Sequence, residues 1–207
     1  MMRAPGFWSR RRSTRSSTDR VGRLRNLSAL PYAYLQTLYS GLISARVVER
    51  SPLVVCQGLI LRPSAAGEEI LLSVRSDVRG WELPGGRVEA GEQAPEALVR
   101  EIHEETGLSV RVERHVGDYV RTGFRPHLAR VYVCRVSSGE ARRSSETLEV
   151  DWFSTNELPR ALLPWYRQPI QDGLADSGHA TRRLEHQGID SIWAAMKIDW
   201  HMRWSSR

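Results

Sequence analysis

Branched apolar residues are concentrated in five short stretches in the middle of the chain, with turn-forming residues such as glycine and proline between some of them. Short runs of this kind are typical of β-strands. The expected strands are Leu53–Leu61, Glu69–Val74, Val110–Val120, Ala129–Val136 and Leu148–Phe153. A helical spacing of apolar residues follows Pro95 and recurs in Tyr166–Ala175 and Ile189–Trp200. Strands mixed with a few helices predict an α+β fold built on a mixed sheet.

Two regions flank this central domain, which we place at residues 51–175. Residues 29–50 carry apolar positions at mixed helical spacing, and we expect a helix that packs on the core. A helix lying on a membrane surface is the alternative. Residues 176–207 form a C-terminal extension with an expected amphipathic helix. There we interpret Trp193, Met196 and Trp200 as packing residues, with capping of a site or a homodimer contact as alternatives.

Charge is distributed unevenly along the chain. The formal net charge is +6, but residues 1–25 hold eight arginines and one aspartate, a local charge of +7 that leaves −1 for residues 26–207. Basic arms can bind nucleic acid or anionic membranes. We interpret residues 1–28, which are also rich in serine, as a disordered and solvated arm. Nucleic acid is therefore not the expected partner, although this arm would be the place to bind it.

Length and apolar content narrow the class of protein. A chain of 207 residues with 41% hydrophobic residues is long enough for one domain with a full core. No uninterrupted apolar run reaches the roughly 20 residues that span a bilayer. Cys56 and Cys134 each lie in an apolar stretch, as buried free thiols of a reducing compartment commonly do. We expect a cytoplasmic protein, with import into an organelle through the Arg- and Ser-rich N-terminus as the alternative.

The segment Pro84–Leu108 carries the candidate chemistry. A glycine-containing loop leads into a helix that is expected to begin near Pro95 and to end before Gly107, which suit a first helical turn and a helix end. Three glutamates stand at positions i, i+3 and i+4 of this helix, so their carboxylates gather on one side. These residues are Glu101, Glu104 and Glu105. Because like charges at this spacing repel, a hard divalent cation such as Mg²⁺ is a natural counter-charge, although most glutamate-rich helix faces are simply solvated.

The same segment resembles the Nudix box. Gly86 is followed after five residues by Glu92 and, after seven more, by the run Arg100–Leu108, which matches every defined position of the box. The likeness covers about residues 52 to 163. It implies the Nudix fold, a mixed β-sheet sandwiched between helices, in which the box forms a loop, a helix and a second loop.

The resemblance also implies a role for each residue of the box. The expected ligands of Mg²⁺, for which Mn²⁺ is a possible substitute, are Glu101, Glu104, Glu105, the carbonyl of Gly85, and Glu146. Glu149 is the alternative to Glu146 for the last of these. Arg100 and Glu92 are expected to orient the loop and the ligating glutamates, one step removed from the cation.

The reaction implied by the resemblance is hydrolysis of a phosphoanhydride bond in a nucleoside diphosphate linked to another moiety. Glu101, Glu104 and Glu105 are the expected catalytic residues. Glu104 is the first candidate for the group that accepts the proton of water, and Glu105 or a loop residue is the alternative. Rival hypotheses are a ligand-sensing module of the same fold without catalysis, and an RNA 5′-pyrophosphohydrolase.

One loop offers candidate substrate contacts. Between the third and fourth expected strands, Arg121 and Arg125 are expected to bind phosphate, and Phe124 to stack on a base. The alternative is an ordinary hairpin connection whose arginines are solvated.

Overall fold

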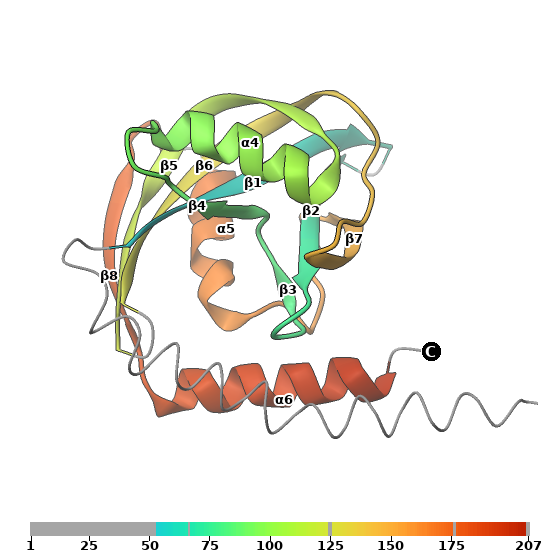
Figure 1. The fold of residues 1–207 in the computed structure, drawn as a ribbon, viewed down its shortest axis with the longest axis vertical. Coiled ribbons are helices and arrows are strands. Elements are labelled where there is room, and N and C mark those ends of the chain that lie inside the picture. Colours follow the sequence, from blue (N-terminus) through green and yellow to red (C-terminus); the bar gives the residue numbers. More distant parts are fainter. Residues whose placement is uncertain (1–52, 66, 124–125, 176, 206–207) are drawn as a thin grey trace, which may run out of the picture. The chain divides into compact units, whose positions relative to one another are not determined.

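A computed structural model describes residues 53–65, 67–123, 126–175 and 177–205. The arm at 1–28 and the expected helix within 29–50 lie outside these residues. One mixed sheet forms the centre of the described part, and helices cover both of its faces (Figure 1). The expected α+β fold, with a mixed sheet between helices, is confirmed.

The sheet has eight strands. They are β1 (Val54–Ser64), β2 (Gly67–Arg75), β3 (Trp81–Glu82), β4 (Gly85–Arg87), β5 (Ser109–Gly123), β6 (His127–Ser138), β7 (Thr147–Ser154) and β8 (Thr181–Gln187). The helical elements are α4 (Ala94–Thr106), the short 3-10 helix η2 (Pro164–Tyr166), α5 (Arg167–Ala175) and α6 (Ile189–Ser205).

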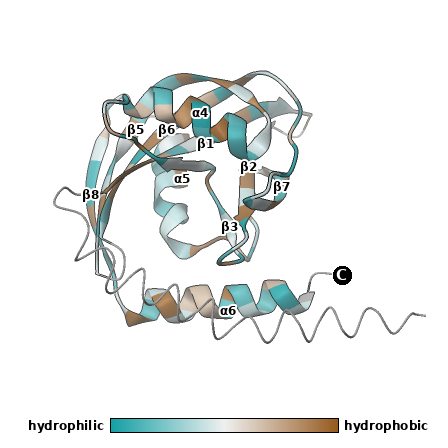
Figure 2. Cartoon of the chain, viewed as in Figure 1, coloured by the Kyte–Doolittle hydropathy of each residue, from teal (hydrophilic) through white to brown (hydrophobic). Residues whose placement is uncertain are grey.

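The strands follow the order β3-β2-β1-β6-β5-β8, with β4 paired to β1 and β7 paired to β2. The β1–β6 and β5–β8 pairs are parallel, and the other pairs are antiparallel. Alternate residues of β1 supply two different cores, as the period of a strand requires. Cys56 and Ile60 pack toward α4, whereas Leu59 and Leu61 face the core that includes η2 and α5. Apolar residues line these inner surfaces of the sheet and helices (Figure 2).

The sheet opens into a fork beside α4. The beginning of β1 pairs with β4, and β1 pairs with β2 only from Leu61 to Ser64. Beyond that point β2 leaves β1 and pairs with β3 at Ser73 and Val74, while its pairing with β7 runs from Glu69 to Arg75. The glycine loop at β4 therefore lies at the mouth of the fork, where the helix that follows it can place side chains.

Strand β8 is an element that the sequence pattern does not predict. Its residues, TRRLEHQ, are mostly polar, and Leu184 alone among them is a large apolar residue. The strand pairs in parallel with β5 from Gly117 to Gly123 at the edge of the sheet, where neither face needs an apolar pattern. The C-terminal extension thus contributes directly to the sheet. Within the helix expected at Tyr166–Ala175, the first residue belongs to η2 and the rest form α5.

Helix α6 continues to Ser205, beyond the expected end at Trp200. The interpretation of Trp193 and Trp200 as packing residues is wrong, because 58% and 52% of their surfaces are exposed. Smaller residues on the other side of the helix, Ala195 and Ile198, pack on the core instead. Both sides of the helix are apolar, so periodicity cannot choose between them. No helix among the described residues is long and apolar enough to cross a membrane.

Candidate functional site

Helix α4 begins and ends where its sequence dictates. Pro95 occupies the first turn, where a missing N–H costs no hydrogen bond. Gly107 ends the helix with a left-handed backbone (φ 75°), and its N–H donates to the carbonyl of His103 at 2.9 Å. Leu98 and Ile102 are fully buried against the sheet. With this face fixed, the glutamates of the last two turns point toward the fork and the solvent.

Two glycines let the loop approach both the helix and the sheet. A side chain at Gly86 would place its Cβ 2.2 Å from the carboxyl carbon of Glu101, so that carboxylate lies directly against the loop backbone. A Cβ at Gly85, whose φ is +145°, would lie 2.1 Å from the carbonyl oxygen of Cys56. The thiol of Cys56 in turn donates to the carbonyl of Gly86 at 3.4 Å. A larger residue at Gly86 would push the loop away from α4, and one at Gly85 would push it away from β1.

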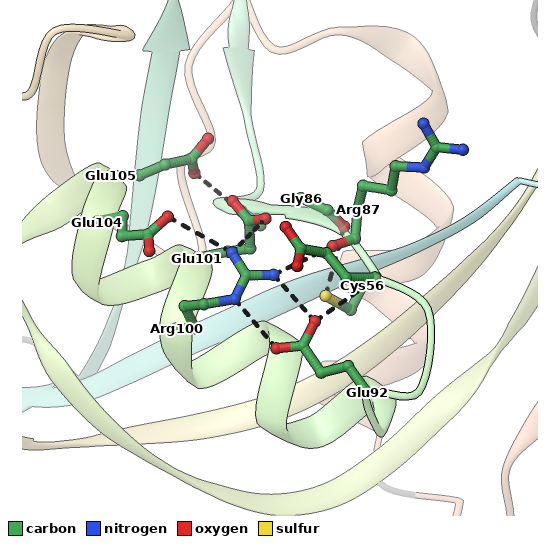
Figure 3. A network of polar contacts seen from close by, with 10 residues as sticks. Cys56, Gly86, Arg87, Glu92, Arg100, Glu101, Glu104 and Glu105 are labelled. Carbon is green, nitrogen blue, oxygen red and sulfur yellow. Dashed lines mark hydrogen bonds and ion pairs between the residues drawn. The ribbon is translucent and has the colours of Figure 1, made fainter.

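Arg100 connects three acidic residues of the box in one network (Figure 3). Its Nε and Nη2 atoms donate to the two carboxylate oxygens of Glu92, each at 3.0 Å. Its Nη1 atom donates to Glu101 at 2.9 Å and to Glu104 at 3.4 Å. The hydrogen bonds from Arg100 hold the pKa of Glu92 below its usual value. This two-pronged contact fixes the guanidinium plane, and the guanidinium then orients the two glutamates of the helix.

Glu105 is the most buried of the three helix glutamates. Only 8% of its surface is exposed, and its carboxylate accepts a hydrogen bond from the Gly85 N–H at 3.0 Å. Burial raises the pKa of Glu105 to about 7, and the charges of Glu101 and Glu146 add to the rise, although the Gly85 N–H and Arg75 oppose it. The buried carboxylate therefore lacks a full counter-charge among its protein neighbours.

The three glutamates share one helix face but point in different directions (Figure 3). The side chain of Glu104 is 60% exposed and contacts Arg100 only at 3.4 Å. Among the described residues, no group of three or more histidine, cysteine, aspartate or glutamate side chains converges on a ready-made cation site. The three carboxylates still fit a hard divalent cation, which prefers oxygen ligands. Glu105 is buried without a full counter-charge, Glu101 lies against the loop, and Glu104 has an exposed side chain.

Glu82 is a fourth carboxylate near this site, and the sequence pattern gave no reason to single it out. Tyr166 donates to its Oε2 atom at 3.0 Å, and Gln57 donates to the Tyr166 hydroxyl at 3.2 Å, which ties β3 to η2 and β1 across the fork. Burial raises the pKa of Glu82 to about 8; Arg75 opposes this, and the charge of Glu105 adds to it. The one sequence feature that could have drawn attention to Glu82 is its position three residues before Gly85, the first glycine of the loop.

The remaining predicted residues fall in different places. Glu146 directly precedes β7, close enough for its charge to raise the pKa of Glu105. Arg121 is 2% exposed; its Nε pairs with Glu185 of β8 at 3.2 Å, and its Nη2 donates to the Trp165 carbonyl at 3.0 Å. Arg121 thus links β8 to the core. Its binding of substrate stays a prediction. Residues 124 and 125, the other predicted substrate contacts, lie outside the described residues.

Comparison with known proteins agrees with this geometry. The model of the NUDIX domain matches residues 55–173. A MutT-like protein of Streptomyces ambofaciens is 34% identical over 131 residues, which cover 63% of this chain and 81% of that protein. An ADP-ribose pyrophosphatase of Methanocaldococcus jannaschii is 36% identical over 115 residues, which cover 53% of this chain and 66% of that protein.

A solved structure shares the fold of this chain. The crystal structure of an ADP-ribose pyrophosphatase from Streptococcus suis superimposes with a TM-score of 0.51 and 25% sequence identity, over 65% of this chain and 100% of that chain. The complete box, its placement at the fork of a mixed sheet, and these matches show that the chain belongs to the Nudix family of hydrolases.

Proposed function

We propose that this Nudix hydrolase cleaves the phosphoanhydride bond of a nucleoside diphosphate linked to a further group, with Mg²⁺ as the bound cation. One observation carries the proposal. The intact box is folded so that Glu101 lies against the glycine loop while the backbone N–H of Gly85 holds Glu105 in place. The names of two similar proteins, both ADP-ribose pyrophosphatases, describe a reaction of this class.

The residues that would hold the cation are those of the expected set. Glu101 and Glu105 would supply carboxylates that are largely enclosed, and Glu104 would add one from its exposed side chain. The Gly85 carbonyl and Glu146 complete the proposed ligands. Mg²⁺ favours such oxygen donors together with water and substrate phosphates, and Mn²⁺ is the expected substitute. When bound, the cation offsets phosphate charge and makes nearby water more acidic.

Glu104 is the proposed proton acceptor. Water attacks one phosphorus, the bond from that phosphorus to the bridging oxygen breaks, and the proton of the water passes to a carboxylate. Glu104 suits this role because most of its side chain is open to solvent, whereas Glu101 and Glu105 are largely enclosed. Arg100 and Glu92 contribute by orienting these carboxylates through the contacts described above. Glu105 or a loop residue is the alternative acceptor.

Substrate binding by Arg121, Phe124 and Arg125 is the part of the proposal that the structure supports least. The side chain of Arg121 is committed to Glu185 and to the Trp165 carbonyl, so it would have to act from within the fold. A role for the basic arm in binding RNA belongs to residues outside the described part. The ligand-sensing alternative is disfavoured because no glutamate of the box is replaced.

A panel of compounds tests the proposed substrate class. The full chain with Mg²⁺ would be incubated with ADP-ribose, nucleotide sugars, dinucleoside polyphosphates, NADH, nucleoside triphosphates and 5′-triphosphorylated RNA, and the products separated by chromatography. We expect the fastest release of a nucleoside monophosphate from one of the nucleoside diphosphate compounds. Faster hydrolysis of RNA or of nucleoside triphosphates would overturn the assignment. Binding of these compounds without any turnover would favour the ligand-sensing module.

A further inference from the structure

Exposed large hydrophobic residues are concentrated in the C-terminal extension. Among the described residues they are Leu148, Leu184, Ile189, Trp193, Trp200 and Trp204. All but the first lie between residues 184 and 204, and the three tryptophans keep 58%, 52% and 55% of their surfaces in solvent. Single exposed apolar residues are ordinary, but a contiguous group of tryptophans on one element usually marks an interaction surface.

The exposed large apolar residues of α6 form one stripe. At about 100° per residue, Ile189, Trp193, Trp200 and Trp204 fall within about 60° of the helix circumference. The Trp200 and Trp204 rings contact each other, with centroids 5.4 Å apart. We call these four residues the α6 stripe.

The opposite side of the helix is fixed on the domain, so the stripe cannot turn inward. Ala195, Ile198 and Met202 pack against the core. Asp199 is completely buried, and its carboxylate accepts a hydrogen bond from the Arg79 N–H at 2.8 Å and pairs with Arg203 at 2.9 Å. Rotating α6 to bury the stripe would expose these apolar contacts and break the buried ion pair, which is unfavourable.

We propose that the α6 stripe is a self-association surface on which two copies of this chain pack their α6 helices antiparallel about a two-fold axis. In such an interface the second helix runs in the opposite direction, so each residue faces the position at the same distance on the other side of the centre. The interface is self-complementary only if these two residues suit each other. The stripe satisfies this condition. Ile189 and Trp204 are equidistant from a point between Met196 and Lys197, and Trp193 and Trp200 are equidistant from the same point. Trp193 of one copy therefore meets Trp200 of the other, and Ile189 meets Trp204.

The helix dipoles and the exposed area agree with this arrangement. The dipoles of two antiparallel helices attract each other, which favours this arrangement. Lys197 flanks the axis, and its flexible stem lets its charge stay in solvent. The exposed parts of the stripe amount to about 500 Å² per copy, or roughly 1,000 Å² for the pair, which reaches the size expected of a specific interface.

The first test measures the mass of the full chain by sedimentation velocity across the micromolar range. We expect a dimer for the wild type and a monomer for Trp193→Glu/Trp200→Glu, with hydrolysis unchanged because neither tryptophan belongs to the proposed site. Leu148→Glu, which alters an exposed apolar residue of β7, is the matched control and should remain dimeric. A wild type that is monomeric at every concentration overturns the proposal, as does a double variant that still dimerises.

A second test examines the register and does not depend on the stability of the tryptophan variant. Mild oxidation of Met196→Cys should give a disulfide-linked dimer, because the two copies of this position lie on either side of the axis. Ile189→Cys is the control, since its two copies would be about 22 Å apart along the helices. The native cysteines are both fully buried and should not interfere. Cross-linking of Ile189→Cys but not of Met196→Cys would overturn the antiparallel register.

Discussion

Glu105→Gln is expected to stabilise the metal-free protein at alkaline pH. Glu105 is 8% exposed in the wild type, and burial raises the pKa of its carboxyl group from an ordinary value of 4.5 to about 7. Glutamine has nearly the same shape, can accept the hydrogen bond from the Gly85 N–H, and carries no charge. The substitution therefore removes the cost of keeping a charged carboxylate inside the fork.

The sign and size of the effect follow from proton linkage. A buried acid with a raised pKa holds its proton more tightly in the folded state than in the unfolded state. Its contribution to stability is complete below pH 4.5, is lost as the pH rises toward 7, and does not return above that value. Because each pKa unit corresponds to about 1.36 kcal/mol, the loss is about 3 kcal/mol in the free energy of unfolding.

The assay is urea unfolding in the presence of a chelator, at about pH 4.5 and about pH 8.5. Glu105→Gln should exceed the wild type by about 2–3 kcal/mol at the higher pH and by much less at the lower pH. Glu104→Gln is the matched control, and its exposed side chain should change stability by no more than about 0.5 kcal/mol. A Glu105→Gln protein that is less stable than the wild type at about pH 8.5 would refute this account of the site.

Two further predictions concern the loop and the sheet edge. Gly86→Ala should raise the Mg²⁺ concentration needed for half-maximal hydrolysis, because the new Cβ would displace the Glu101 carboxylate; an unchanged Mg²⁺ titration would contradict the close packing of loop and helix. Arg121→Met should lower the free energy of unfolding by about 3 kcal/mol, since it leaves Glu185 without its buried partner. Unchanged urea stability with a raised KM would instead place Arg121 in substrate binding.

The sequence was most informative where local chemistry fixes the structure. Helix α4 could be predicted because its start, its end and its buried face are each encoded by nearby residues, from Pro95 to Gly107. The box added the spacing of the acidic residues, which the structure arranges around Arg100. These features depend on contacts between residues that are close in the chain.

Features that depend on distant contacts could not be predicted. Strand β8 has no apolar alternation, and its place is set by pairing with β5 and by the Arg121–Glu185 contact. Glu82 looks like a surface residue in the sequence, but the fold leaves its side chain only 12% exposed and brings the Tyr166 hydroxyl to it across the fork. Helix α6 has two apolar faces, and the face that packs on the core also carries the buried Asp199, whose partner is the distant Arg79 N–H.

The turnover number of Glu104→Gln on the best compound of the panel, with Mg²⁺ present, tests the central claim most directly. Glu96→Gln, which changes an exposed glutamate in the first turn of the same helix, is the matched control and should retain wild-type turnover. We expect Glu104→Gln to remain folded and to lose at least about two orders of magnitude in turnover, the usual scale for a group that accepts a proton. Near-normal turnover of a folded Glu104→Gln protein would remove Glu104 from the reaction and contradict the proposed mechanism.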